Sequence, residues 1–176
     1  SAYGWPIVVP DGVPSLAMGA CLGVVIGRTA CRVRADDALD FVAGYTVGND
    51  VSVPHDSFYR PMVRYRCRDG FCPLGPWVIA RRHVPAPDYL AIRVEIDGAV
   101  RQRATTGTFV RTVAQLLADV TEFMTLAPGD VLLTGVPADA PLAHAGQRVA
   151  VTIDGVGTLV NTLVATEGVA HTGAVP

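Results

Sequence analysis

The sequence has few charged residues, no long apolar run, no internal repeat and no segment of biased composition. Charged side chains make up 17% of the 176 residues, and the formal net charge is -2. This balance offers no basic surface for a nucleic acid or an acidic membrane. No run approaches the ~18 apolar residues of a membrane-spanning helix, and the first residues lack the pattern of a signal peptide. We therefore expect no nucleic-acid partner and no membrane partner.

The four cysteines form no CxxC pair, and the histidines lack the spacing of a zinc site. Two of the cysteines lie in apolar, strand-like runs, so we expect free buried thiols. Free thiols are typical of a reducing compartment, which indicates a cytoplasmic protein. Ser57 and Cys21 have no nucleophile-elbow context, which argues against a covalent hydrolase.

Half of the residues are hydrophobic, and the chain carries 18 glycines and 13 prolines. This composition is typical of a packed, turn-rich domain dominated by β-structure. The length suits one domain over residues 1–176. The chain begins abruptly inside a strand-like run, so we expect residues before Ser1, and one of them could belong to the site.

Apolar patterns predict a β-dominated α+β fold with one long helix. Asp97-Gly98 and Asp154-Gly155 indicate hairpin turns. A short helix is expected over 36–42 and the long one over 108–125, with Thr108 as its N-cap and an apolar stripe from Phe109 to Met124 facing the core. The expected strands cover 19–27, 29–33, 45–53, 77–80, 89–96, 99–103, 131–135, 149–153 and 157–164.

Most of the polar chemistry lies between residues 44 and 79. Four arginines occur in nine residues, which is a high density for a chain with so few charges. Acidic residues and one histidine accompany them. The candidate site residues in this stretch are Asp50, His55, Asp56, Arg60, Arg64, Arg66, Arg68 and Asp69.

Five motifs in order resemble the fumarylacetoacetate hydrolase family: GYTVGND, SFYRP, RDGFCPLGPW, EFMTLAPGDVLLTGVP and DGVGTLVN. The resemblance runs from about residue 6 to residue 166. Within the family, the motifs look most like the isomerase/decarboxylase branch of 4-hydroxyphenylacetate (homoprotocatechuate) degradation. The resemblance implies a mixed β-sheet roll, a Mg²⁺ or Mn²⁺ cofactor that chelates a 2-oxo carboxylate, and basic side chains that bind distal carboxylates.

The sequence departs from the family pattern at the metal ligands. The resemblance implies Glu-x-Glu where this chain has Gly19-Ala20-Cys21, and only Asp50 of the three ligands is retained. A cysteine sulfur is a poor ligand for a hard cation. We therefore expect no tight metal site in this chain. The amino-terminal half of the bifunctional enzymes lacks the same motif, so the chain looks like that half, or the first of two separate subunits.

Other departures concern substrate contacts. Arg66 stands where the family has a lysine in K-x-x-D-G, and Val136 replaces a threonine in the TGTP loop that begins with Thr134 and Gly135. By resemblance, the substrate-binding residues are Arg60, Arg66, Thr134 and Gly135, and the catalytic residues are Asp69 and Arg66.

Each of these residues has a second interpretation. Asp50 fits a metal or substrate site and equally a strand-end hydrogen bond. Arg66 fits a cleft or a surface salt bridge, and Asp69 fits an acid/base role or an Asx turn. Arg60 is typical of packing over an aromatic ring. His55-Asp56 has the residue types of a dyad, but adjacent residues of an extended segment point to opposite sides.

Three functions remain open at this point. The chain is an enzyme subunit acting on a small 2-oxo dicarboxylate or tricarboxylate, or a silent paralogue that completes a hetero-oligomer with an active, homologous subunit. A sensing or carrier role for an anion is the third. The first two imply a homo- or hetero-oligomer.

Overall fold

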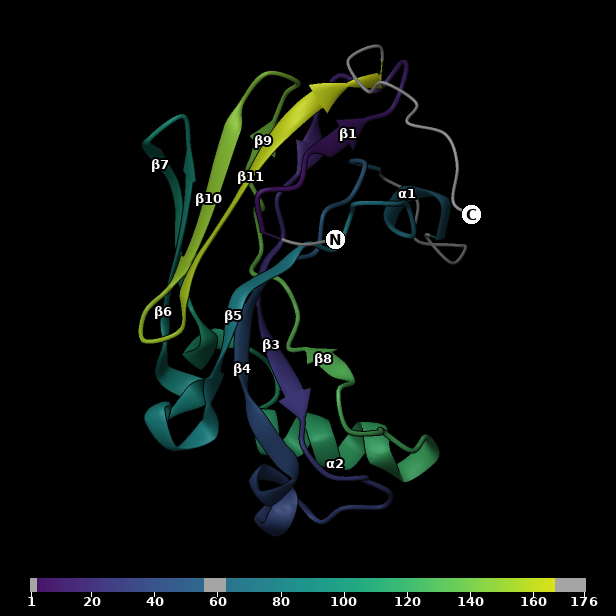
Figure 1. The fold of residues 1–176 in the computed structure, drawn as a ribbon, viewed down its shortest axis with the longest axis vertical. Coiled ribbons are helices and arrows are strands. Elements are labelled where there is room, and N and C mark those ends of the chain that lie inside the picture. The colour runs from purple at the N-terminus through teal and green to yellow at the C-terminus, as the bar shows by residue number, and fades with distance from the viewer. Residues whose placement is uncertain (1–2, 56–62, 167–176) are drawn as a thin grey trace.

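The computed structural model describes residues 3–55 and 63–166. Within them the chain forms a four-stranded sheet, a five-stranded sheet and a short two-stranded ribbon (Figure 1). In spatial order, the first sheet holds β5 (Leu74–Ala80), β4 (Val42–Asn49), β3 (Ala20–Ile26) and β8 (Val131–Leu133). The second holds β1 (Ile7–Val9), β11 (Gly157–Ala165), β10 (Arg148–Ile153), β6 (Ala91–Ile96) and β7 (Ala99–Thr105), and the ribbon pairs β2 (Leu16–Ala17) with β9 (Leu142–Ala143).

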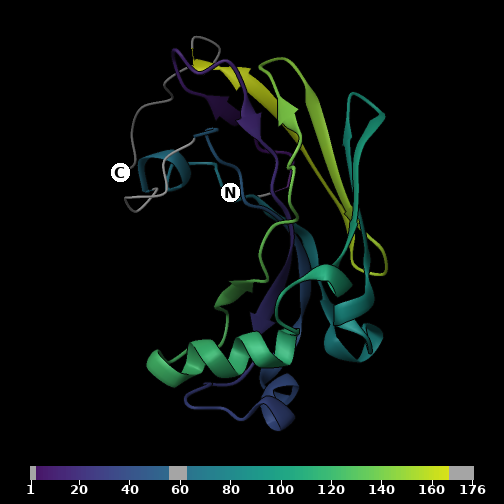
Figure 2. The same cartoon turned by 180° about the vertical axis from the view of Figure 1, so that it is seen from behind.

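The helices are few and mostly short. The longest in the described ranges is α2 (Val113–Phe123), which lies across one end of the four-stranded sheet, while α1 (Val63–Arg66) lies near the opposite end (Figure 2). The 3₁₀ turns are η1 (Ala35–Phe41), η2 (Arg81–His83), η3 (Pro87–Tyr89) and η4 (Thr106–Thr108). The predicted β-dominated α+β class is confirmed. No helix in the described ranges combines the length and apolar character that a membrane crossing needs.

The core lies where the two sheets face each other. β10 and β11 of the larger sheet contact β4 of the smaller one. Tyr45 and Val47 of β4, Val151 of β10 and Leu159 of β11 are all buried. Burial of these large side chains is the main favourable term that holds the sheets together.

The two predicted hairpins are present. In β6, Ile92, Val94 and Ile96 alternate with more exposed residues and face the core. Asp97 and Gly98 both have positive φ angles, 52° and 79°, as a type I′ turn requires. The β10–β11 hairpin turns at 154–156 with its strands in antiparallel register.

The predicted strand over 29–33 is wrong. Only Ala30 makes a bridge there, with Leu126. Arg32 has a φ of 49°, which breaks the extended conformation, and its amide donates to the Thr121 carbonyl. The amide of Val33 donates to the Thr121 hydroxyl. The segment therefore bonds to α2 rather than to a neighbouring strand.

The long helix is shorter than predicted. It begins at Val113, and its N-cap is Thr112, whose hydroxyl accepts from the Gln115 amide at 3.1 Å. Thr108 instead ends the 3₁₀ turn η4. The carboxylate of Asp88 also accepts from the first helical amide, at 2.7 Å. A contact from a distant residue thus helps to fix the helix start.

The predicted apolar stripe of α2 is core only in part. Val113 and Leu117 are buried, whereas Phe123 is 76% exposed and Met124 is 48% exposed. The predicted burial of the thiols is also wrong for all but one: Cys21 is buried, and the other three cysteines are exposed.

We expect Leu117→Ala to lower the free energy of unfolding by about 2–5 kcal/mol, because it opens a cavity under α2. Phe123→Ala should change it by less than about 0.5 kcal/mol, because that ring is exposed. Urea unfolding followed by circular dichroism measures both. Equal losses would contradict the burial pattern.

We expect Asp97→Asn to lower the melting temperature by a few degrees at neutral pH. The Asp97 carboxylate accepts from the Arg148 amide at 2.9 Å and from Gln147 at 2.8 Å. These bonds hold the pKa of Asp97 below its ordinary value. Its stabilisation is present above the unfolded pKa and is lost as the pH falls through the folded pKa. The difference in melting temperature between the Asp97→Asn variant and the parent chain should therefore disappear at acidic pH. Asp154→Asn, in the second hairpin, is the control.

Candidate functional site

The candidate site lies where β3 and β4 end side by side. Ala20 is opposite Asn49 in the antiparallel register, so Gly19 lies next to Asp50. The Asp50 amide donates to the Gly19 carbonyl at 2.7 Å. A Cβ atom on Gly19 would lie 2.3 Å from the Asp50 carbonyl oxygen and 2.9 Å from Cγ2 of Val136. The backbone is therefore closed against any side chain at position 19, and the loop that carries Val136 borders the same point.

Arg66 reaches this point from α1. Its Nη1 donates to Oδ2 of Asp50 at 2.8 Å, with the two side chains 50% and 23% exposed. Backbone bonds hold the helix in place, since the Val53 amide donates to the Tyr65 carbonyl at 2.9 Å. Two of the predicted site residues are thus in direct contact.

Two thiols accompany Asp50. Burial raises the pKa of the Cys21 thiol strongly, and the charge of Asp50 adds to the effect. Partial burial of the sulfur, and then Asp50, also raise the pKa of Cys72, although the residue as a whole is exposed. Both thiols are therefore protonated and neutral at physiological pH. Cys72 was not singled out in the sequence, because nothing in its local pattern places it near Asp50.

The residues at this point do not fit a divalent cation. Gly19 supplies no ligand and leaves no room for one, and Cys21 supplies a buried neutral thiol where Mg²⁺ or Mn²⁺ prefers oxygen. The remaining acid, Asp50, is already paired with Arg66. Across residues 3–55 and 63–166, no three or more His, Cys, Asp and Glu side chains gather in a way that could hold a metal ion.

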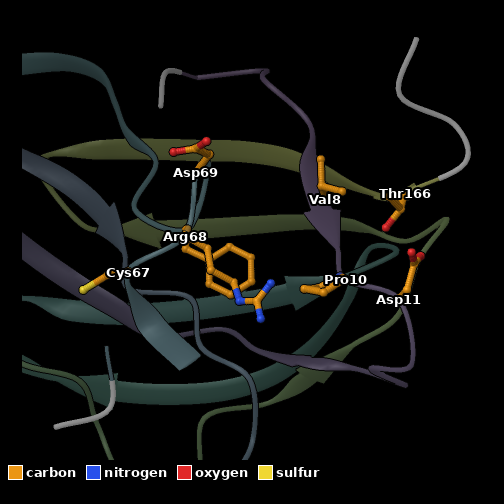
Figure 3. Close-up of a pocket in the computed structure, with 8 residues that line it drawn as sticks. Val8, Pro10, Asp11, Cys67, Arg68, Asp69 and Thr166 are labelled. Carbon is orange, nitrogen blue, oxygen red and sulfur yellow. The ribbon is translucent and has the colours of Figure 1, made fainter. Parts of the chain in front are cut away.

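Asp69 lies in a different hollow from the ion pair. It sits at a turn in which the Phe71 amide donates to the Arg68 carbonyl. The hollow has a volume of about 550 Å³, and Figure 3 shows the Asp69 carboxylate pointing away from the Arg68 guanidinium. Its lining residues are Val8, Pro10, Asp11, Cys67, Arg68, Asp69, Phe71 and Thr166. The acid/base role of Asp69 stays a prediction, and the sequence did not point to Asp11 because that residue is far away along the chain.

Thr134 and Gly135 line a third hollow, of about 420 Å³, between the loop after β8 and the segment before α2. The Thr134 hydroxyl donates to the Leu22 carbonyl at 3.2 Å. Gly135 has a φ of 103°, a conformation that favours glycine. Their role in substrate binding stays a prediction.

The predicted residues of the segment before α1 are only partly described. Arg60 and Asp56 lie outside the described residues. Of the His55-Asp56 pair, the structure therefore describes His55 alone. His55 packs against Tyr65, with ring centroids 4.9 Å apart. This contact gives His55 a packing role.

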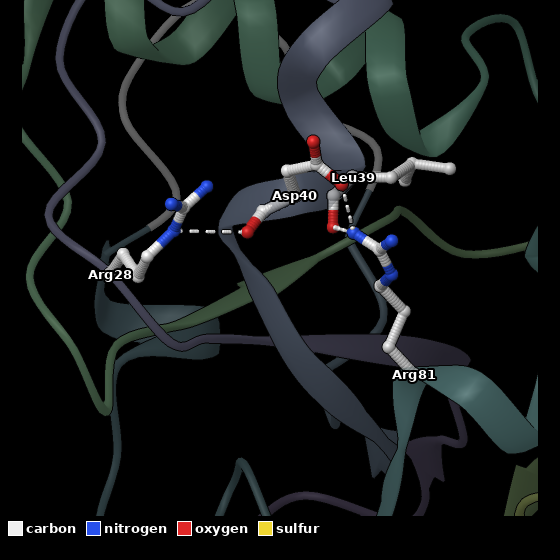
Figure 4. Close-up of polar contacts among 4 residues, drawn as sticks. All are labelled: Arg28, Leu39, Asp40 and Arg81. Atoms are coloured by element: carbon white, nitrogen blue, oxygen red, sulfur yellow. Dashed lines mark hydrogen bonds and ion pairs between the residues drawn. The ribbon is translucent and has the colours of Figure 1, made fainter.

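A second charged cluster lies at the other end of the four-stranded sheet (Figure 4). Arg81 donates to Oδ1 of Asp40 at 2.6 Å and to the Leu39 carbonyl, and Arg28 donates to the Asp40 carbonyl at 3.1 Å. The hydrogen bond and charge of Arg81 hold the pKa of Asp40 below its ordinary value. Arg28 also lies over the ring of Phe41, at 4.7 Å. These contacts close the last turn of η1, so the cluster is explained by the fold.

Comparison with known proteins confirms the resemblance. Residues 1–164 match the family model Fumarylacetoacetate (FAA) hydrolase C-terminal, and the chain belongs to this family. It is 42% identical over 161 residues to the homoprotocatechuate catabolism bifunctional isomerase/decarboxylase of Escherichia coli. That alignment covers 92% of this chain and 36% of the relative, so the chain spans about a third of the length of that relative.

Solved structures show the same fold. The 5-carboxymethyl-2-hydroxymuconate delta-isomerase of Mycobacterium smegmatis superposes with a TM-score of 0.87 at 36% identity, over 94% of this chain and 65% of that one. The fumarylpyruvate hydrolase of Pseudomonas aeruginosa, solved with Mn²⁺ and pyruvate, has a TM-score of 0.85 at 27% identity, over 93% and 73%. That hydrolase was solved with a divalent metal, whereas the residues of this chain do not fit one.

We expect Gly19→Ala to lower the free energy of unfolding by about 1–3 kcal/mol, because its Cβ would press on the Asp50 carbonyl. Gly107→Ala is the matched control, since its nearest contact is the Asp88 carbonyl oxygen at 3.2 Å. Urea unfolding measures both variants. A Gly19→Ala variant as stable as the parent chain would contradict the closure at this position.

Proposed function

We propose that this chain is a subunit of a 5-oxopent-3-ene-1,2,5-tricarboxylate decarboxylase / 2-hydroxyhepta-2,4-diene-1,7-dioate isomerase of 4-hydroxyphenylacetate breakdown. The named activities of its relatives support the reaction class. The observation that carries the proposal is the Arg66–Asp50 contact at the edge of β3 and β4. It presents a half-exposed guanidinium that is oriented by Asp50.

The chemistry of Arg66 suits a small, multiply anionic 2-oxo acid. A guanidinium has five N–H donors in a planar fork, and one donor atom of Arg66 is used by Asp50. The free edge can accept a carboxylate with two parallel hydrogen bonds. Arg60, Thr134 and Gly135 stay proposed substrate-binding residues and Asp69 a proposed acid/base. Asp69 lines a separate hollow from Thr134 and Gly135, so the described part of this chain does not bring them together at Arg66.

We propose that the divalent cation, where the reaction uses one, is held by a homologous subunit or second half that carries Glu-x-Glu. In this proposal the chain is the amino-terminal half, or the first subunit, of a cytoplasmic oligomer. The Escherichia coli relative, of which the alignment covers 36%, is long enough to hold a second part beside the matched one, which supports such an arrangement. The metal stabilises developing negative charge on the substrate when bound in that partner.

The alternative is a catalytically silent paralogue that completes the oligomer around an active subunit. The closure of the backbone at Gly19 favours it, because that closure removes the first ligand position of the family. The two functions differ in whether Arg66 contributes to turnover.

We expect Arg66→Gln to lower kcat/KM for the decarboxylation about tenfold to a hundredfold in the complex with a Glu-x-Glu-bearing partner, because a charge-assisted hydrogen bond to the substrate is lost. Arg34→Gln should change nothing, because Arg34 lies in an exposed pair with Asp36 at 3.5 Å. Steady-state kinetics of the chain with and without its partner provide the measurement.

Three outcomes separate the functions. Turnover that needs the partner and falls with Arg66→Gln supports the proposal. Turnover by the complex that is indifferent to Arg66→Gln supports the silent paralogue. An absence of turnover in both states, with and without Mg²⁺, would contradict the enzymatic proposal.

A further inference from the structure

The position of Asp50 already has a cation beside it. Nη1 of Arg66 lies 2.8 Å from Oδ2 of Asp50, and the carboxylate is only 23% exposed. Because the arginine is half exposed, water still screens the pair, and its contribution is to fix the direction of the guanidinium rather than to add much stability. A divalent ion approaching Asp50 would have to displace the guanidinium and find further oxygen ligands.

Those further ligands are excluded by the packing. The Cβ position of Gly19 falls on the Asp50 carbonyl, so a carboxylate there would require the two strands to move apart. Cys21 is fully buried, and a Cβ on the neighbouring Gly48 would lie 2.9 Å from its sulfur. The space around the thiol is therefore filled, and the neutral sulfur would not hold a hard cation.

Among the residues that the structure describes, the charges at this point are balanced without a metal. One carboxylate, Asp50, faces one guanidinium, Arg66. The nearby thiols carry no charge, because burial of Cys21, partial burial of Cys72 and the charge of Asp50 all raise the thiol pKa above its ordinary value. The guanidinium is half exposed, so its remaining N–H groups are accessible to a ligand. A carboxylate that binds there meets a cation whose direction is already fixed by Asp50.

We infer that Arg66, oriented by Asp50, serves as the built-in cation of this site and binds the 2-oxo carboxylate end of the ligand without a divalent metal. The inference rests on the proposed function, which it makes more specific. Arg66 then touches the ligand, and Asp50 is a positioning residue and not a metal ligand.

Isothermal titration of the full chain with 2-oxoglutarate, a simple 2-oxo dicarboxylate, tests the inference. We expect the same Kd in excess EDTA and in Mg²⁺ or Mn²⁺. Arg66→Gln should weaken binding about tenfold or more, and Arg66→Lys by less, because the charge is kept and the fork is lost. Arg34→Gln serves as the matched control for the removal of an exposed arginine charge.

A second readout follows the metal itself. The electron paramagnetic resonance signal of free Mn²⁺ should not be attenuated by the chain, with or without 2-oxoglutarate. Thermal unfolding of Arg66→Gln verifies that the variant is folded, which its exposed position favours.

The outcomes separate the inference from the proposed function. Binding of 2-oxoglutarate only when Mn²⁺ is present, or stoichiometric loss of the Mn²⁺ signal, overturns the inference and leaves the proposed function standing. Metal-independent binding with a Kd that Arg66→Gln leaves unchanged also overturns it. An absence of binding under every condition overturns the anion site and the inference together.

Discussion

The close approach of β3 to the end of β4 is the constraint on which the site depends. The bond from the Asp50 amide to the Gly19 carbonyl brings two backbones together where only a hydrogen fits on position 19. The same approach fixes Asp50 at the sheet edge and brings the loop of Val136 against it. Because Asp50 cannot share a metal with position 19, its carboxylate is available to Arg66.

The chain has the family's fold, while the residues at Gly19, Cys21 and Asp50 do not fit a metal. Its backbone superposes on that of the fumarylpyruvate hydrolase solved with Mn²⁺ and pyruvate. The fold depends on buried apolar residues of both sheets, and none of those needs a metal ligand at position 19 or 21. Architecture and chemistry are therefore separable here, and the chemistry has to be argued from Asp50, Arg66 and their neighbours.

Local patterns in the sequence predicted the parts of the fold that depend on neighbouring residues. The alternation of Ile92, Val94 and Ile96 and the Asp97-Gly98 turn are of this kind. The start of α2 was not predictable in the same way, because the Asp88 carboxylate that caps it lies 25 residues before Val113. The segment around Arg32 was misjudged because its bonds go to Thr121.

The same distinction, between what neighbouring residues determine and what distant residues determine, applies to the candidate site. The motifs indicated Asp50 and Arg66 as residues of interest, but not that they touch, since 16 residues separate them along the chain. Asp69 was expected beside them, and a tight turn places it in the hollow with Asp11 and Arg68 instead. Contacts between distant segments depend on packing that short motifs do not encode.

The close backbone approach at Gly19 also limits which substitutions such a domain can accept. The Cβ atom of a glutamate at position 19 would clash with the Asp50 carbonyl oxygen, and no bound cation would yet offset that cost. A glutamate at position 21 alone would place an unpaired charge in a filled, buried space. Each single substitution towards a metal centre would therefore lower the free energy of unfolding before a metal could bind.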